Sequence, residues 1–119
     1  MKNVLWISRH EMTDVQLADL ERIMGGPVHL LLWRDTVRDV SALAPAVERS
    51  DAVAAVLPLE LMAALLRLAG ERPLLQAVSE RRPTGKLRTT PEGKTEPEFA
   101  FVHRCWQQLV RLELETKIL

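Results

Sequence analysis

Residues 4–16 read Val4-Leu5-Trp6-Ile7-Ser8-Arg9-His10-Glu11-Met12-Thr13-Asp14-Val15-Gln16, a short apolar run followed by a series of polar side chains. The apolar part predicts a strand over Asn3–Ile7 that is covered on both faces. Thr13 and Gln16 have the spacing of a capping box, in which a Thr hydroxyl and a Gln amide satisfy free N–H groups at a helix start. The segment therefore predicts a strand, a polar loop, and a helix over Asp14–Met24.

The alternation of strand and helix continues along the chain. Val28–Trp33 predicts a second buried strand, and the apolar runs Asp51–Leu57 and Leu74–Val78 predict two more. Leucines at helical spacing predict a helix over 58–69, and Ser41 is a candidate cap for a short helix before the third strand. The pattern predicts an α/β fold with a mainly parallel sheet and helices on both faces.

The last third of the chain changes character. Residues 83–97 contain three prolines and two glycines, which predicts a flexible surface loop or an exposed hairpin. Residues 98–119 alternate apolar and polar side chains, as at Phe99 and Phe101, and this period of two predicts a C-terminal β-hairpin. A single helix is the alternative, because Glu, Leu, Gln and Arg are good helix formers.

Composition indicates one globular domain, 1–119. Its 119 residues suffice for one modest core, and 47% of them are hydrophobic. Sixteen Lys and Arg side chains balance sixteen Asp and Glu, so the formal net charge is zero. No global basic field attracts DNA or other long nucleic acid, although a local pocket can still hold a small anion.

Several segments that would place the chain elsewhere are missing from its sequence. The single cysteine, Cys105, excludes an intrachain disulfide and a Cys-rich zinc site. The first residues lack the apolar segment of a signal peptide, and no apolar run approaches the length of a membrane span. We therefore expect a cytoplasmic protein that does not contact membranes, and the sequence implies no metal or other cofactor.

Polar side chains follow three of the predicted strands. Because the carboxyl ends of parallel strands meet at one edge of a sheet, we expect these clusters to form one basic pocket flanked by an aromatic side chain. Arg side chains grip phosphate in a bidentate manner, a helix start favours anions, and Trp33 could stack a base. The clusters are Ser8, Arg9, His10 and Thr13; Trp33, Arg34 and Asp35; and Ser79, Arg81 and Arg82, with Lys86 nearby.

Each cluster also has a purely structural interpretation. Ser8 and Thr13 can satisfy the loop and cap the helix, and Arg9 and Arg34 can be solvated surface charges.

His10, in a polar loop, is the best candidate for proton transfer near neutral pH. An RNA-like substrate carries its own nucleophile, the ribose 2′-hydroxyl, so an enzyme could cut it without a metal by aligning that group and stabilising the phosphorane.

The run Ser8-Arg9-His10-Glu11-Met12-Thr13 with Gln16, together with Phe101-Val102-His103 and Trp106, resembles the small single-domain CARF-like proteins of type III CRISPR systems. The resemblance implies a Rossmann-like domain that dimerises and binds a cyclic oligoadenylate across its two-fold axis. Some members of the family are ring nucleases, and others only sequester the messenger as sinks. Family roles carry over to Ser8, Arg9, His10 and Thr13 alone.

We therefore expect a homodimer that binds cyclic tetra-adenylate, an RNA-derived ligand, and cleaves it as a metal-independent ring nuclease. Ser8, Arg9 and His10 would be catalytic, and the binding residues would also include Thr13, Trp33, Arg34, Ser79, Arg81 and Arg82. A non-catalytic sink is the alternative. The Arg9-His10 pair and Thr13 also resemble the opening motif of histidine phosphatases, but Glu11 replaces the Gly of that family and would repel phosphate. A plain interaction module is the third alternative.

Overall fold

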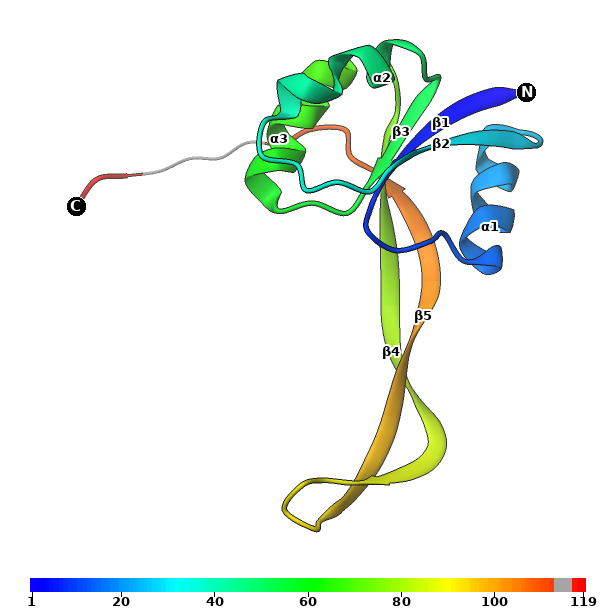
Figure 1. Ribbon diagram of the computed structural model, residues 1–119, viewed down its shortest axis with the longest axis vertical. Coiled ribbons are helices and arrows are strands. Elements are labelled where there is room, and N and C mark those ends of the chain that lie inside the picture. The colour runs from blue at the N-terminus through cyan, green and yellow to red at the C-terminus, as the bar shows by residue number, and fades with distance from the viewer. Residues whose placement is uncertain (113–116) are drawn as a thin grey trace.

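The structure, a computed structural model, describes residues 1–112 and 117–119. One five-stranded sheet has the strand order β2-β1-β3-β4-β5, with helices on both faces (Figure 1). The first four strands are parallel and β5 is antiparallel to β4, so the predicted α/β fold with a mainly parallel sheet is confirmed. The elements are β1 (Lys2–Ile7), α1 (Asp14–Met24), β2 (Val28–Trp33), the 3₁₀ helix η1 (Val40–Leu43), α2 (Ala44–Glu48), β3 (Ala52–Ala55), α3 (Leu59–Ala69), β4 (Leu74–Thr89) and β5 (Thr95–Gln108).

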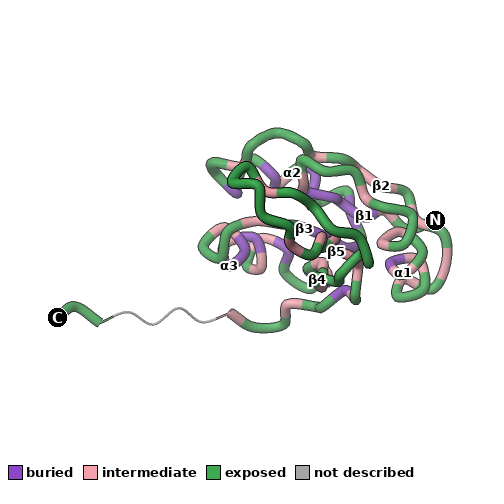
Figure 2. Tube along the Cα trace, turned by 90° about the horizontal axis from the view of Figure 1, so that it is seen from below, coloured by how far each residue is buried: buried purple, intermediate pink, exposed green. Residues whose placement is uncertain are grey.

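β1 lies inside the sheet, and its side chains alternate between two apolar clusters. Val4 and Trp6 pack on the face covered by α1, together with Leu20 of that helix. Leu5 and Ile7 pack on the opposite face, which η1, α2 and α3 cover. Burial on both faces explains the continuous apolar run, and Figure 2 shows that buried residues gather in the sheet and the helices that cover it.

β2 corrects one expectation, because it is an edge strand rather than a second buried strand. It pairs with β1 alone, and none of its six residues is fully buried. His29 and Leu32 are exposed. The sequence does not reveal this difference, because five of the six residues of β2 are apolar and the pattern does not show which strand stands at the edge of the sheet.

The capping box that the sequence predicts is present at the start of α1. Thr13 Oγ1 accepts a hydrogen bond from the Gln16 N–H at 3.1 Å, and Gln16 Oε1 accepts one from the Thr13 N–H at 2.9 Å. Gly25 ends the helix with φ +83°, a left-handed conformation that favours glycine. At η1 the cap is Asp39 rather than Ser41, because the Asp39 carboxylate accepts from the Ser41 N–H at 2.9 Å.

The segment 83–97 forms an exposed hairpin, one of the two alternatives that the sequence predicts, and most of it is strand. β4 and β5 form a long antiparallel pair joined by a turn at residues 90–94, and the pair extends away from the helices (Figure 1). The strand predicted near Phe99 belongs to β5, but its partner is β4 rather than a later segment. Residues 109–112 are not in a strand, and the remainder of the expected second arm, 113–116, lies outside the described residues.

Irregular positions in this pair account for its prolines and glycines. The register shifts between Pro83 and Leu87, where Gly85 has φ +83°, and Gly93 in the turn has φ +79°.

In residues 1–112 and 117–119, we find no helix with both the length and the apolar character needed to cross a membrane.

Candidate functional site

A cavity of about 310 Å³ lies at the carboxyl ends of β1, β2 and β3. β1 lies between β2 and β3 in the sheet, so the chain runs outward from β1 to β2 and then crosses back over β1 to reach β3. Such a reversal leaves a crevice between the loops that follow the two inner strands, which is where ligands bind in open α/β sheets. The lining residues are Ile7, Ser8, Arg9, His10, Asp35, Thr36, Val37, Val56, Leu57, Pro58 and Leu61.

Hydrogen bonds hold the loop that follows β1 at the mouth of this cavity. The Ser8 N–H donates to the Trp33 carbonyl at 3.1 Å, and the Ser8 hydroxyl accepts from the His10 N–H at 3.1 Å. Trp6 Nε1 donates to the His10 carbonyl at 3.0 Å. The backbone of residues 8–10 is therefore fixed from both sides, while the side chains of Arg9 and His10 are exposed.

The Arg9 guanidinium reaches across to the loop that follows β2. It donates a hydrogen bond to the Thr36 hydroxyl, which holds its positive charge beside the cavity. Asp35 lines the same cavity and supplies a carboxylate, so the site is not uniformly basic. A phosphate would bind on the Arg9 side, whereas the carboxylate suits a hydroxyl or amino group of the same ligand.

The first turn of α3 borders the cavity through Pro58 and Leu61. Pro58 is the N-cap residue, and no side chain caps the N–H groups of this turn. Such unsatisfied N–H groups carry the positive end of the helix dipole, which attracts anions. Thr13, at the helix start expected to bind the anion, does not line the cavity, and its hydroxyl caps α1.

The second predicted cluster is only partly in the cavity. Asp35 lines it, but Trp33 and Arg34 do not. Trp33 packs against the apolar cluster under α2 and α3, and its Nε1 has no hydrogen-bond partner among the described residues. Arg34 lies 3.7 Å from the Glu11 carboxylate, and both side chains are exposed.

The third predicted cluster lies on β4, beyond the part of this strand that pairs with β3. Ser79 pairs with His103, and the Arg82 side chain forms an ion pair with Glu80. The Arg81 guanidinium carbon lies 3.9 Å from the centre of the Phe99 ring. None of the three lines the cavity at Ser8–His10, so a single chain does not bring the predicted clusters into one pocket. Arg81 lines a separate hollow of about 310 Å³, between the strands of the β4–β5 pair.

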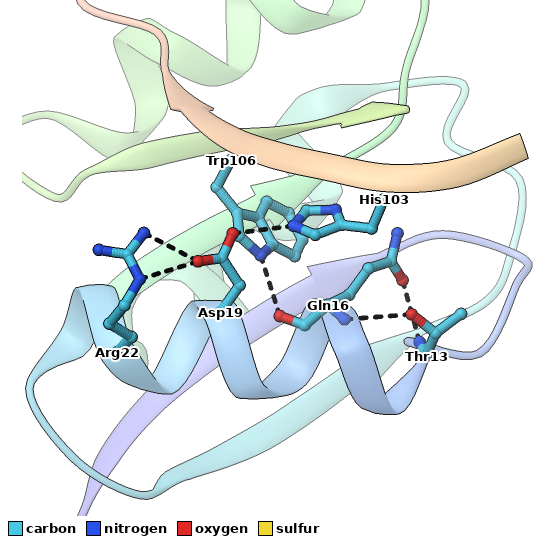
Figure 3. Close-up of polar contacts among 6 residues, drawn as sticks. All are labelled: Thr13, Gln16, Asp19, Arg22, His103 and Trp106. Carbon is cyan, nitrogen blue, oxygen red and sulfur yellow. Dashed lines mark hydrogen bonds and ion pairs between the residues drawn. The ribbon is translucent and has the colours of Figure 1, made fainter. Parts of the chain in front are cut away.

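His103 joins β5 to α1 (Figure 3). Its Nε2 lies 2.9 Å from Asp19 Oδ2, and Trp106 Nε1 donates to the Gln16 carbonyl at 3.0 Å. The hydrogen bond with His103, and then those from Arg22, lower the pKa of the Asp19 carboxyl below its ordinary value of 3.8. The His103 side chain is 5% exposed, so this group fastens β5 to α1 rather than facing a ligand.

The sequence interpretation missed Thr36, Val37 and the loop that follows β3. A usable signal was present, because Pro58 opens a helix directly after a predicted strand, which places Val56–Pro58 at the carboxyl edge. Among residues 1–112 and 117–119, no group of three or more His, Cys, Asp or Glu side chains is placed to hold a metal ion.

The cavity combines three kinds of contact. Arg9 and the first turn of α3 can bind a phosphate, Asp35 can accept hydrogen bonds from hydroxyl or amino groups, and the apolar side chains Ile7, Val56 and Leu57 can pack against a planar base. These contacts suit a nucleotide better than an inorganic anion. No protein-family model, curated protein or solved structure matches the chain.

Proposed function

We propose that the cavity binds one nucleotide unit of a cyclic oligoadenylate. The observation that carries the proposal is the placement of the Arg9 guanidinium and the uncapped first turn of α3 on one cavity at the reversal between β1 and β3. Two positive groups would hold the phosphate, and the apolar wall would receive the adenine. Asp35 would accept a hydrogen bond from the ribose or from the adenine amino group.

The proposal includes a Rossmann-like domain of the CARF type that acts as a homodimer. The parallel order β2-β1-β3-β4 supports it, because doubly wound nucleotide-binding sheets share this arrangement. A volume of about 310 Å³ is at the lower end for small-molecule sites and suits one nucleotide rather than a ring of several. Two cavities related by a two-fold axis would offer the same groups twice to a ring with the same symmetry.

Cleavage would use the ligand's own 2′-hydroxyl as the nucleophile. His10 would accept its proton while the 2′-oxygen bonds to phosphorus and the bond from phosphorus to the 5′-oxygen breaks, and the departing oxygen would take a proton from water. The products are a 2′,3′-cyclic phosphate and a 5′-hydroxyl. Arg9 would stabilise the charge that develops on the phosphorane.

Labelled cyclic tetra-adenylate, incubated with the protein in the presence of a metal chelator, tests this proposal. Arg9→Ala should weaken binding about 10- to 100-fold, because a hydrogen bond from a charged group is worth about 1.5–3 kcal/mol. Arg67→Ala removes an exposed cation that does not line the cavity and serves as the matched control. Equal affinity of both variants would contradict the assignment of Arg9.

The same assay separates an enzyme from a sink. Linear product in molar excess over protein, with a rate that His10→Ala lowers more than it lowers binding, supports cleavage. Stoichiometric retention of intact ring supports a sink with the same binding residues. Failure to retain cyclic oligoadenylates of any ring size would refute both forms of the proposal.

A further inference from the structure

The part of the β4–β5 pair that leaves the sheet, residues 79–104, is here named the ribbon. β4 pairs with β3 only through Leu74–Gln76, so in the part of the chain that the structure describes both edges of the ribbon lack a neighbouring strand. Two strands alone are at best marginally stable in water. β4 runs parallel to β3, so its carboxyl end lies at the same edge of the sheet as the carboxyl end of β3. The ribbon therefore leaves from the edge that also holds the cavity (Figure 1).

The ribbon exposes large apolar side chains that have no core of their own. Phe101 is 78% exposed, Leu87 69% and Phe99 41%. On the sheet body, the loop after β3 and the start of α3 also expose apolar side chains, since Val56 and Leu59 are each 55% exposed. Both groups therefore lie on or beyond the same edge of the sheet.

Charge is divided unevenly between the ribbon and the rest of the chain. The ribbon has net charge +2, and the remaining residues have 10 cationic and 12 acidic side chains, net −2, because the whole chain has 16 of each. Two ribbons facing each other would repel, whereas a ribbon against the body of another copy would attract. The ribbon's six cations are Arg81, Arg82, Lys86, Arg88, Lys94 and Arg104, and its four carboxylates are Glu80, Glu92, Glu96 and Glu98.

We propose that the ribbon of one copy docks on the carboxyl edge of a second copy, over its Val56 and Leu59, and that the exchange is reciprocal about a two-fold axis. Covering the exposed parts of Phe99 and Phe101 removes roughly 250 Å² per ribbon, given about 200 Å² for a whole side chain. The exchange occurs twice and the receiving surface loses a similar area. The two rings alone thus reach about 1,000 Å², which is the lower limit for a specific interface.

This arrangement brings the third predicted cluster to the cavity from outside. The partner's Arg81 and the partner's Phe101 would stand beside the loops that carry Arg9 and His10, and would complete a site that one chain leaves open. This completion of the site rests on the proposed function, whereas the docking of the ribbon does not.

Sedimentation velocity over a range of protein concentrations tests the docking without any ligand. The wild-type chain should be a dimer, and both Phe101→Glu on the ribbon and Leu59→Glu on the receiving surface should give folded monomers. Val15→Glu changes a side chain that is 63% exposed on α1 and should leave the dimer intact. A wild-type monomer at all concentrations, or a dimer that tolerates Phe101→Glu, would overturn the proposal.

Crosslinking tests where the ribbon docks. In a Cys105→Ser background, a mixture of Phe101→Cys and Leu59→Cys chains should form mixed disulfide dimers on oxidation. If crosslinks form only between two Phe101→Cys chains, the ribbons pair with each other and the proposed placement is wrong. A disulfide forms when the two cysteines come close together and then holds the two chains covalently, so this measurement also works for a weak dimer.

Subunit mixing tests the composite site and separates its failure from that of the proposed function. Arg9→Ala and Arg81→Ala chains should each bind labelled AMP, a probe that fills one cavity, poorly, while their equimolar mixture should regain about a quarter of the wild-type sites, since half the dimers are mixed and each holds one intact cavity. No recovery would show that Arg81 does not act on the partner's cavity. If wild-type protein binds no ring but its dimer depends on Phe101, the proposed function fails and the docking stands.

Discussion

Replacing Asp19 by Asn should weaken the junction between α1 and β5 by a predictable amount. The Asp19 carboxylate bonds to His103 at 2.9 Å and to two nitrogens of Arg22 at 2.8 and 3.0 Å. Arg22 is 72% exposed, so its ion pair contributes little, whereas the His103 side chain is 5% exposed. Asn keeps the shape but replaces a charged hydrogen bond with a neutral one, which should cost about 1–1.5 kcal/mol of unfolding free energy.

The effect should depend on pH, and its sign follows from the lowered pKa of Asp19. A carboxyl group whose pKa is lower in the folded protein stabilises the fold above its unfolded pKa, and this contribution is lost as pH falls through the folded value. Asn resembles the protonated carboxyl group. The difference between wild type and Asp19→Asn should therefore be present in full at pH 5 and shrink towards zero below the ordinary value of 3.8.

Urea unfolding at a series of pH values from about 5.5 to 2.5 measures this difference, and an unchanged m-value shows that the denatured state is comparable. Glu92→Gln makes the same chemical change at an exposed position in the turn between β4 and β5 and should stay within about 0.5 kcal/mol. A difference for Asp19→Asn that is equally large at pH 5 and at pH 2.5 would refute the reasoning.

Three further changes test the fold. Thr13→Ala removes the cap of α1 and should cost about 1 kcal/mol in urea unfolding, and a value near zero would mean that the capping box contributes nothing. Leu65→Ala empties a fully buried position and should cost about 2–5 kcal/mol, with a smaller loss contradicting its place in the core. Gly93→Ala, at φ +79°, should cost about 1 kcal/mol and speed amide exchange in the ribbon, whereas Gly26→Ala, without a positive φ, should not.

Local signals account for the parts of the fold that the sequence predicts well. The capping box at Thr13, the left-handed Gly25 and the apolar stripe of α1 act within a few residues, so they can be read without knowing the tertiary structure. The apolar run at β1 is equally informative because both of its faces are covered. These signals place the first loop at the edge of a parallel sheet, where the cavity lies.

The failures concern properties that depend on distant partners. β2 has a buried composition although it is an edge strand, and only its neighbours in the sheet determine that position. Residues 83–97 have the composition of a loop, so the sequence leaves a loop and a hairpin open; they form strands because residues 87–89 pair with residues 95–97 and turn residues such as Gly93 allow the chain to reverse. The pairing of β4 with β5 depends on residues that are separated in the sequence, so a local pattern of apolar and polar residues gives little indication of it.

The prediction of the site has the same limit. Ser8, Arg9, His10 and Asp35 are brought together because each follows a parallel strand directly. Arg81 and Arg82 also follow the apolar part of β4, but this strand continues past the edge of the sheet and takes them with it. The assumption that a strand ends where its apolar run ends therefore holds for β1 and β2 and fails for β4.

Two tryptophans, Trp6 and Trp106, connect the loop that lines the cavity to the root of the ribbon. Trp6 donates to the carbonyl of His10 in the cavity loop, and its ring meets Trp106 edge to face at 5.7 Å between centroids. Trp106 lies at the root of the ribbon and donates to Gln16, which also belongs to the cap of α1. The contact between the two rings therefore connects the root of the ribbon to the backbone of residues 8–10.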